Sequence, residues 1–265
     1  IMEIVLDTHL IDKNILARYS AVDIGNSRLK ILFGNTYETF SYNSNFTNSL
    51  KIFLSNFSKN EIIFAISSVN SIILNEFLKI ISNFNQFNYI LVNSLLEEQI
   101  LVDFSQISGT GDDRKLGIIG GLIYSNPPFV TIDVGTATTI NILNENNIFE
   151  GGVIMPGPQT QMNALNQSAI ALKEYRIEIP NAIIGKNTVD AINSGIINGS
   201  VGAILFFLDY IKNNIISVDD FPVFITGGAA KTILKNLRNY KSNIIDTPYL
   251  VLLGILFLLM NNKLY

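Results

Sequence analysis

The sequence predicts an α/β protein built from two similar halves, and three observations support this fold class. Apolar strand-like segments alternate with amphipathic helical segments along the chain. The segment AVDIGNSRLKILFG at residues 21–34 has a counterpart, TIDVGTATTINILN, at residues 131–144. Glycine and polar residues follow several expected strands, which is where ligands bind in open α/β sheets. We therefore expect duplicated halves that face each other across a cleft, although chance repetition of a common strand–turn pattern would also produce the two segments.

The first half is expected to contain a hairpin and further strands and helices in alternation. Residues 21–34 form an apolar strand, a tight turn that carries an acid and a glycine, and a second β-rich stretch. Buried strands are expected at 61–68 and 88–94, and amphipathic helices at 48–57 and 74–84.

The second half begins with the matching hairpin at 131–144. It continues with a strand at 148–157, a pair of helices punctuated by glycine at 188–211, and a strand that enters a glycine turn at 222–228. The apolar run from Leu250 to Met260 is far shorter than the roughly 20 residues that span a bilayer, so we expect a buried helix there. The boundary falls near 105–125, and we assign residues 20–115 and 116–265 to the two halves; no weight is placed on residues 1–19.

Composition excludes several classes of function. The chain has 265 residues and a formal net charge of −4, which gives no basic footprint for nucleic acid. It has no cysteine, so disulfides and thiolate chemistry are absent. Its one histidine, His9, argues against histidine zinc clusters and most Ser-His-Asp hydrolases. The first 20 residues lack the uninterrupted apolar stretch of an export signal, so we expect a cytoplasmic protein.

Four segments carry residues suited to binding a phosphorylated ligand: DIGNS (23–27), GDDR (111–114), DVGTATT (133–139) and TGG (226–228). Exposed amides, hydroxyls and carboxylates together suit a metal–nucleotide complex. Each of these segments, taken alone, could also be an ordinary hairpin turn or the start of a helix. Neither a Walker A pattern nor a complete dinucleotide-binding fingerprint occurs, which disfavours P-loop and Rossmann folds.

The order and spacing of these segments resemble type III pantothenate kinases. SSV (67–69), GGVIMPG (151–157), IGKNT (184–188), ITGG (225–228) and LVLLGI (250–255) extend the resemblance from about residue 21 to 255. It implies the duplicated actin-like (ribonuclease H-like) ATPase fold of the acetate kinase, sugar kinase and actin superfamily, with two halves around a nucleotide cleft. It also implies transfer of the γ-phosphoryl group of ATP to pantothenate, the first step of coenzyme A synthesis.

The resemblance further implies roles for individual residues and partners. Asp113 is expected to be the general base, and Asp133 to bind a monovalent cation, K⁺ or NH₄⁺. ATP is expected to enter with Mg²⁺ or another divalent cation, and the enzyme to be a cytoplasmic homodimer without nucleic-acid or membrane partners. The residues expected to bind ATP are Asp23, Ile24, Gly25, Asn26, Ser27, Arg28, Leu29, Lys30 and Thr136. Those expected to bind pantothenate are Phe104, Gly111, Asp112, Asp113, Arg114 and Thr188.

The chemistry of two of these residues agrees with the implied roles. A hydroxyl that attacks phosphorus must lose a proton, and the Asp113 carboxylate can accept it. The planar guanidinium of Arg114 can hold the pantothenate carboxylate through two hydrogen bonds. A surface helix start would also account for both residues.

The sequence departs from the family pattern at several positions. Phe104 stands where the family commonly has tyrosine, and Gly117 replaces a usual asparagine. Arg28 and Lys30 add positive charge to the first loop. The alternatives are a non-catalytic accessory regulator of the same family that binds ATP or a protein, and a kinase or phosphatase of the same fold that acts on a sugar, acetate or polyphosphate.

Overall fold

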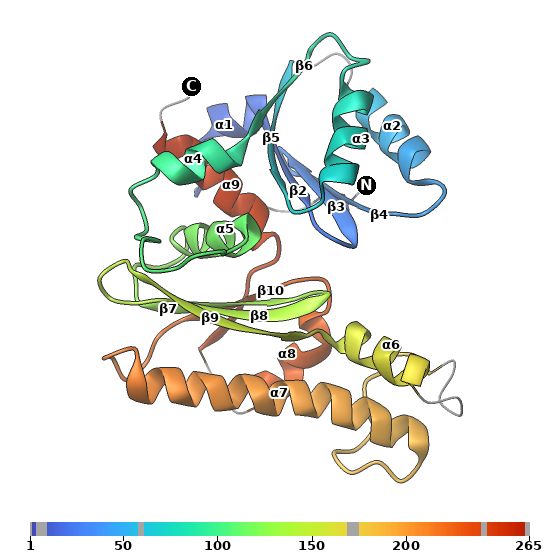
Figure 1. Ribbon diagram of the computed structural model, residues 1–265, viewed down its shortest axis with the longest axis vertical. Helices are drawn as coiled ribbons and strands as arrows, with labels where there is room; N and C mark the ends of the chain where they lie inside the picture. Colours follow the sequence, from blue (N-terminus) through green and yellow to red (C-terminus); the bar gives the residue numbers. More distant parts are fainter. Residues whose placement is uncertain (1, 4–9, 58–60, 169–174, 240–242, 263–265) are drawn as a thin grey trace. The chain divides into compact units, whose positions relative to one another are not determined.

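The computed structural model describes residues 2–3, 10–57, 61–168, 175–239 and 243–262. Within those residues the chain forms two compact units, each built around its own β-sheet (Figure 1). Unit 1 draws on residues 1–102, 108–124 and 250–265, and unit 2 draws on residues 103–107 and 125–249.

The sheet of unit 1 has the strand order β1-β4-β3-β2-β5-β6. Strands β2, β3 and β4 form an antiparallel meander, while β5 and β6 run parallel to β2. The strands are β1 (Met2–Glu3), β2 (Tyr19–Ile24), β3 (Arg28–Phe33), β4 (Thr36–Ser41), β5 (Ile62–Ser68) and β6 (Phe87–Leu91).

The sheet of unit 2 repeats this arrangement, with the order β11-β10-β7-β8-β9. Strands β7, β8 and β9 are antiparallel, and β10 and β11 run parallel to β7. The strands are β7 (Phe129–Val134), β8 (Ala137–Leu143), β9 (Phe149–Pro156), β10 (Val223–Thr226) and β11 (Ile244–Asp246). Both predicted Asp-x-Gly hairpins are therefore present, and the expected duplication is confirmed at the level of strand order and direction.

Side-chain alternation divides the sheet of unit 1 into two faces. Val22, Ile24 and Phe64 lie in an apolar cluster with helices α2 (Phe46–Ser55) and α3 (Ser71–Ile81). The opposite face contacts α9 (Leu250–Asn261), α5 (Asp112–Gly121), α4 (Val92–Glu98) and α1 (Lys13–Arg18). Asp23 belongs to this second face because it alternates with Val22 and Ile24.

Glycines allow α5 and α9 to pack at close range. A Cβ atom added to Gly254 of α9 would lie 2.9 Å from the carbonyl carbon of Leu116, and closer still to its oxygen. Gly120 of α5 has the same relation to the carbonyl group of Leu250. The backbones of these helices therefore touch, which fixes the position of α5 and of the residues at its N-terminus.

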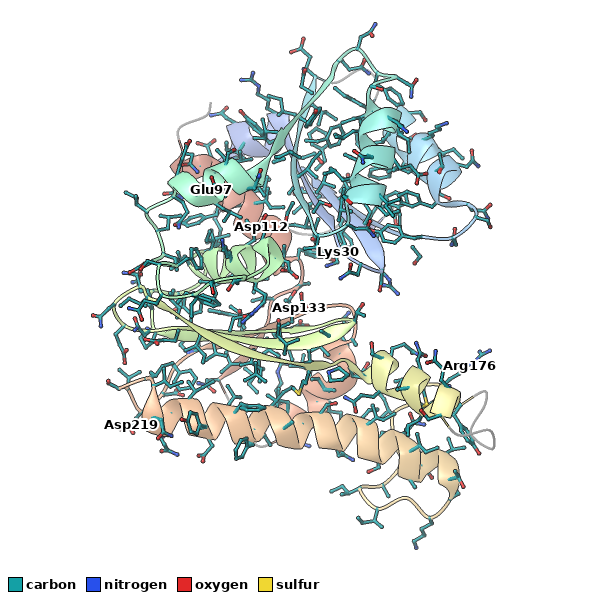
Figure 2. All side chains as sticks on the ribbon, in the orientation of Figure 1. Lys30, Glu97, Asp112, Asp133, Arg176 and Asp219 are labelled. Atoms are coloured by element: carbon teal, nitrogen blue, oxygen red, sulfur yellow. The ribbon has the colours of Figure 1, made fainter. Side chains whose placement is uncertain are left out.

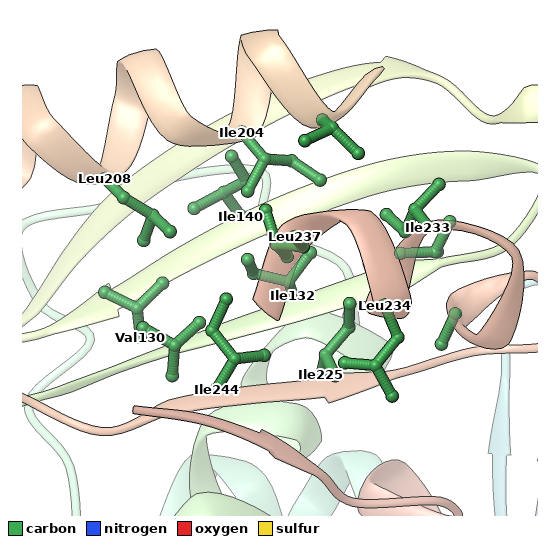
Figure 3. Packing of buried hydrophobic residues seen from close by; sticks show 14 of the residues in the cluster. Val130, Ile132, Ile140, Ile204, Leu208, Ile225, Ile233, Leu234, Leu237 and Ile244 are labelled. Carbon is green, nitrogen blue, oxygen red and sulfur yellow. The ribbon is translucent and has the colours of Figure 1, made fainter. Parts of the chain in front are cut away.

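In unit 2, α7 (Thr188–Asn214) and α8 (Ala230–Arg238) cover one face of the sheet (Figure 1). Ile204 and Leu208 of α7 and Ile233 of α8 pack against Ile132 and Ile140 of the sheet (Figure 3). Asp133 alternates with Ile132 and Val134, so it lies on the face opposite α7 (Figure 2). Helix α6 (Pro158–Ser168) follows β9.

Two sequence predictions are corrected. Residues 188–211 were expected to form a pair of helices, but they belong to a single continuous helix, the 27-residue α7. An interior glycine weakens a helix by only about 1 kcal/mol, and tertiary packing offsets this loss. Residues 88–94 do not form a buried strand: β6 ends at Leu91, is mostly exposed at the sheet edge, and leads directly into α4. The buried helix expected at 250–260 is confirmed as α9.

Helix α7 is also long and apolar enough to cross a membrane, and it is the one described helix that meets that test. Its buried residues, which include Ile197, Ile204 and Leu208, lie in the core of unit 2. A core helix satisfies the same criterion, and this packing accounts for the composition of α7.

The compact units divide the chain differently from the halves 20–115 and 116–265. Residues 103–107 belong to unit 2, whereas α5 and α9 belong to unit 1. Helix α9 joins unit 1 because it packs on α5, β2 and β5. The two sequential halves as duplicated domains stay a prediction.

Candidate active site

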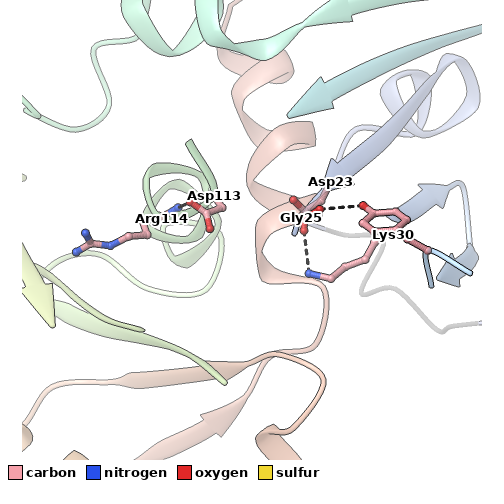
Figure 4. Close-up of polar contacts among 6 residues, drawn as sticks. Asp23, Gly25, Lys30, Asp113 and Arg114 are labelled. Carbon is pink, nitrogen blue, oxygen red and sulfur yellow. Dashed lines mark hydrogen bonds and ion pairs between the residues drawn. The ribbon is translucent and has the colours of Figure 1, made fainter. Parts of the chain in front are cut away.

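In unit 1, the turn between β2 and β3 holds an ion pair beside a tight loop. Asp23 and Lys30 are direct partners in the antiparallel register, so both side chains lie on the same face of the sheet. Lys30 Nζ lies 2.8 Å from Asp23 Oδ2, and the Asp23 side chain is only 7% exposed (Figure 4). The Gly25 amide donates to the Arg28 carbonyl at 3.0 Å and closes the turn.

Tyr42 anchors this turn from the end of β4. Its hydroxyl donates to the Gly25 carbonyl at 2.9 Å, and its ring packs edge-on against Phe46 at a centroid separation of 5.2 Å. Burial, and then the charge of Asp23, raise the pKa of Tyr42, so the phenol stays protonated and keeps donating. The sequence analysis missed Tyr42, because only the β3–β4 pairing brings it beside the turn.

Asp113 and Arg114 occupy the first turn of α5, which begins after its N-cap, Gly111. Asp113 Oδ1 accepts a hydrogen bond from the Arg114 amide at 2.9 Å. Burial raises the pKa of Asp113, and the negative charge of Asp23 adds to this, whereas the Arg114 amide, the Arg114 charge and Lys30 lower it. The charges of Asp113, Asp23 and Lys30 therefore act on one another within unit 1.

The two neighbouring side chains point in different directions. The Asp113 carboxylate lies on the side of α5 toward Asp23, and the Arg114 guanidinium extends away from both (Figure 4). Burial lowers the pKa of Arg114, an effect opposed by Asp113. The arrangement separates the half-buried Asp113 carboxylate from a cation that can hold an anionic group some distance from it.

In unit 2, the hairpin between β7 and β8 meets two other glycine turns. Gly227 has a φ of +101°, and an added Cβ would clash with the carboxylate of Asp133 and lie 2.6 Å from the Val134 amide nitrogen. Gly157, which follows β9, packs against the Gly135 carbonyl, and its amide donates to the Thr136 carbonyl at 2.9 Å. Asp133, the hairpin turn and the TGG segment are thus in direct contact.

Among the described residues, no group of three or more His, Cys, Asp or Glu side chains could hold a metal ion. A divalent ion at either Asp-x-Gly turn would need further ligands from the molecule that it accompanies. Phosphate oxygens and water are the usual remaining ligands of Mg²⁺ in nucleotide sites. The residues present therefore fit a cation that enters with a nucleotide.

Comparison with known proteins decides which family carries this arrangement. Residues 21–209, more than half of the chain, match the family model described as type III pantothenate kinase. The chain belongs to the type III pantothenate kinase family.

A curated relative of this family covers nearly the whole chain. It is a type III pantothenate kinase from Sulfurihydrogenibium sp., 29% identical over 256 residues, which are 90% of this chain and 98% of the relative. The family and this relative do not favour the alternative of an accessory regulator.

Solved structures with a similar fold include a Campylobacter jejuni protein assigned to the Baf family of transcriptional activators. It has a TM-score of 0.57 and 23% identity, and the match covers 92% of this chain and 98% of that protein. Ta0583, an archaeal actin homologue, has a TM-score of 0.51 and 12% identity over 92% of this chain and 99% of its own. These similarities show the fold, and they agree with the expected actin-like class.

The structure separates the residues expected to bind ATP into two groups. The side chains of Ile24 and Leu29 are fully buried in the core of unit 1. These two residues could therefore contact a nucleotide only through their backbone atoms. Asn26, Ser27 and Arg28 are exposed at the turn, and Thr136 is exposed at the corresponding turn of unit 2.

The residues expected to bind pantothenate lie in both units. Gly111, Asp112, Asp113 and Arg114 belong to unit 1, and Phe104 and Thr188 belong to unit 2. The Phe104 ring packs on Phe149 at 5.4 Å, and hydrogen bonds of Asp103 with Asn147 and Phe149 hold its loop. Thr188 is the exposed first residue of α7.

Proposed function

We propose that this protein transfers the γ-phosphoryl group of ATP to the terminal hydroxyl of pantothenate and makes 4′-phosphopantothenate, with Asp113 as the general base. The observation that carries the proposal is the position of Asp113 in a member of this family. Its half-buried carboxylate interacts electrostatically with Asp23 and Lys30, the charged pair at the first Asp-x-Gly turn.

Asp113 takes the proton from the attacking hydroxyl. Burial raises the pKa of Asp113, which makes its carboxylate a stronger base than that of an ordinary aspartate. The Arg114 amide holds Oδ1 and so orients the carboxylate. Positioned acid–base groups of this kind contribute about 100-fold or more to the rate.

The first turn binds the phosphates of ATP. The exposed residues Asn26, Ser27 and Arg28 offer amides and positive charge, and Lys30 offers an ammonium group. Asp23 would hold the divalent cation, which when bound neutralises charge on the transferred phosphoryl group. Tyr42 keeps the turn in one conformation through the Gly25 carbonyl.

Arg114 recognises the carboxylate of pantothenate, and the N-terminus of α5 with Gly111 and Asp112 supplies further contacts. Thr188 offers a hydroxyl at the start of α7. Phe104 contributes apolar contact only, because it lacks the hydroxyl that the family commonly has at this position.

We assign a monovalent cation, K⁺ or NH₄⁺, to Asp133. A single half-buried carboxylate beside the turns at Gly135 and Gly227, with backbone carbonyls nearby, suits a large singly charged ion better than Mg²⁺. The Asp133→Asn variant should lose the difference in rate between KCl and NaCl buffers.

We further propose a cytoplasmic homodimer, and α7 carries the support for the dimer. Phe206 and Tyr210 are 65% and 53% exposed, and they share one helix face with Gly195, Gly199 and Gly202, where an added Cβ would meet nothing within 4 Å. An open face of small and aromatic residues suits packing against the same helix of a second copy. Light scattering should show a dimer that Phe206→Asp converts to monomer.

The reaction is tested by incubating the protein with ATP, Mg²⁺, K⁺ and pantothenate, and by following ADP release and product mass. We expect phosphopantothenate from the parent, and a loss of at least about 100-fold in kcat for Asp113→Asn. Asp219→Asn, at a fully exposed carboxylate, is the matched control and should keep the parent rate. Binding of ATP without product would refute the proposed reaction.

A further inference from the structure

Ser67 places a buried hydroxyl beside the Asp23–Lys30 pair. The residue is 2% exposed, and its Oγ has no hydrogen-bond partner within the part of the chain that the structure describes. In the parallel register between β2 and β5, Ser67 stands directly opposite Asp23, so the two side chains lie on the same face of the sheet.

Two other serines of the same sheet have hydrogen-bond partners within the chain. Ser20 Oγ donates to the Leu32 carbonyl at 3.3 Å, and Ser68 Oγ donates to the Asn70 carbonyl at 3.1 Å. Burying a hydroxyl without a partner destabilises a protein, whereas alanine at the same place would not. Among the described residues, Thr39 Oγ1 of β4 also lacks a partner; Ser67 differs in standing directly opposite Asp23, so a ligand of Asp23 can supply its partner.

The same position carries a hydroxyl in unit 2. Thr226 ends β10 and stands directly opposite Asp133 in a parallel register, just as Ser67 of β5 stands opposite Asp23. Thr226 is also buried, at 6% exposure. A carboxylate with a neighbouring buried hydroxyl thus occurs at both Asp-x-Gly turns, although the surrounding sequences differ.

The surroundings of Ser67 are polar and charged. Lys30 Nζ donates a hydrogen bond to Asp23 Oδ2 (Figure 4). Asp113 interacts electrostatically with both residues. Helices α5 and α9 cover this face of the sheet. An oxygen brought in by a ligand of Asp23 would therefore lie within a largely desolvated region, where one hydrogen bond has a large effect.

We propose that Ser67 is a ligand-binding residue that donates its hydroxyl to an oxygen of the metal–nucleotide complex held at Asp23. That oxygen belongs either to a water molecule of the divalent cation, which keeps several waters in such sites, or to a phosphate group. The inference rests on the proposed function in one respect, namely that the ligand of Asp23 is a metal nucleotide.

The first test is the stability of the ligand-free protein. Ser67→Ala removes a hydroxyl that has no partner, so the urea midpoint should stay equal to that of the parent or rise. Ser20→Ala, the matched control on β2, removes a made hydrogen bond and should lower the midpoint. A decrease for Ser67→Ala equal to that for Ser20→Ala would show that the hydroxyl is already bonded, and would overturn the inference.

The second test is binding of Mg²⁺–ADP by calorimetry. Ser67→Ala should raise the Kd about tenfold, and Ser67→Cys, a weak donor of similar size, should also raise it, whereas Ser20→Ala should leave it unchanged. Titration with Mn²⁺ alone and with ADP in EDTA distinguishes the sources: weaker Mn²⁺ binding identifies a cation-bound water, and weaker ADP binding identifies a phosphate oxygen. A Kd for Mg²⁺–ADP within twofold of the parent in Ser67→Ala would overturn the inference.

The outcome is separable from that of the proposed function. A parent protein that binds Mg²⁺–ADP but makes no phosphopantothenate would refute the reaction and still allow the Ser67 comparison. A parent protein that binds no Mg²⁺–ADP would overturn both.

Discussion

The contact between α5 and α9 allows a prediction that links packing to catalysis. In Gly254→Ala, the new Cβ would lie 2.9 Å from the Leu116 carbonyl carbon, where carbon atoms need about 3.5–4.0 Å. The neighbouring atoms are backbone, which cannot rotate away as a side chain can. The helices must therefore separate by at least roughly 0.6–1.1 Å, the difference between these distances, because the Leu116 oxygen lies closer still.

The expected loss of stability follows from two opposing effects. Overpacking of this kind destabilises a protein by about 1–3 kcal/mol, and alanine recovers up to about 1 kcal/mol through its higher helix propensity. Because the clashing atoms are backbone, the upper part of the overpacking range applies, and the net effect is about 1–2 kcal/mol, or a decrease in Tm of roughly 2–8 °C for a chain of this size. Because α5 carries Asp113, a shift near 1 Å should also lower kcat by about 100-fold.

The assay combines thermal and urea unfolding, followed by circular dichroism, with the steady-state phosphorylation rate. Ile52→Ala on α2 is the control, because the Ile52 side chain is 60% exposed and belongs to no proposed site or interface. It should change stability by less than about 0.5 kcal/mol and leave the rate unchanged. Parent-like stability and rate for Gly254→Ala would refute the close packing on which the reasoning rests.

Three further predictions concern the two turns and the base. The pKa of Asp113 in the folded protein is raised above its ordinary value of 3.8. The protonated carboxyl therefore contributes stability below pH 3.8, and this contribution is lost as the pH rises through the folded-state pKa. Asp113→Asn should therefore be more stable than the parent at neutral pH while inactive, and urea midpoints measured from pH 3.5 to 8 should show the difference vanish at the acid end. Tyr42→Phe removes the bond to the Gly25 carbonyl and should raise the KM for ATP about fivefold, with the KM for pantothenate unchanged in initial-rate measurements; equal changes in both constants would contradict this. Gly227→Ala should displace Asp133 and abolish the stimulation of the rate by KCl, and a parent-like salt response would show that Gly227 does not support the cation site.

Local patterns in the sequence account for the predicted strands and hairpins. Alternation and turn residues depend on short-range sterics, so both Asp-x-Gly hairpins and the buried helix at the C-terminus could be predicted. The continuous helix α7 could not, because its glycines would weaken an isolated helix, and only the packing of residues such as Ile204 and Leu208 on the sheet offsets that effect. The exposure of β6 likewise depends on its place at the edge of the sheet.

The candidate site divides in the same way. The chemical identity of Asp23, Asp113 and Asp133, and the motifs around them, are readable from the sequence, because the family resemblance lies in the order and spacing of those residues. The roles of Tyr42 and Ser67 depend on strand pairing between distant segments: β3 with β4 places Tyr42 at the turn, and β2 with β5 places Ser67 opposite Asp23. Pairing of this kind depends on the whole sheet and not on any local segment. The sequence therefore determined which residue types are present at the candidate site. Only the tertiary structure decided their burial, their hydrogen bonds and their pKa shifts.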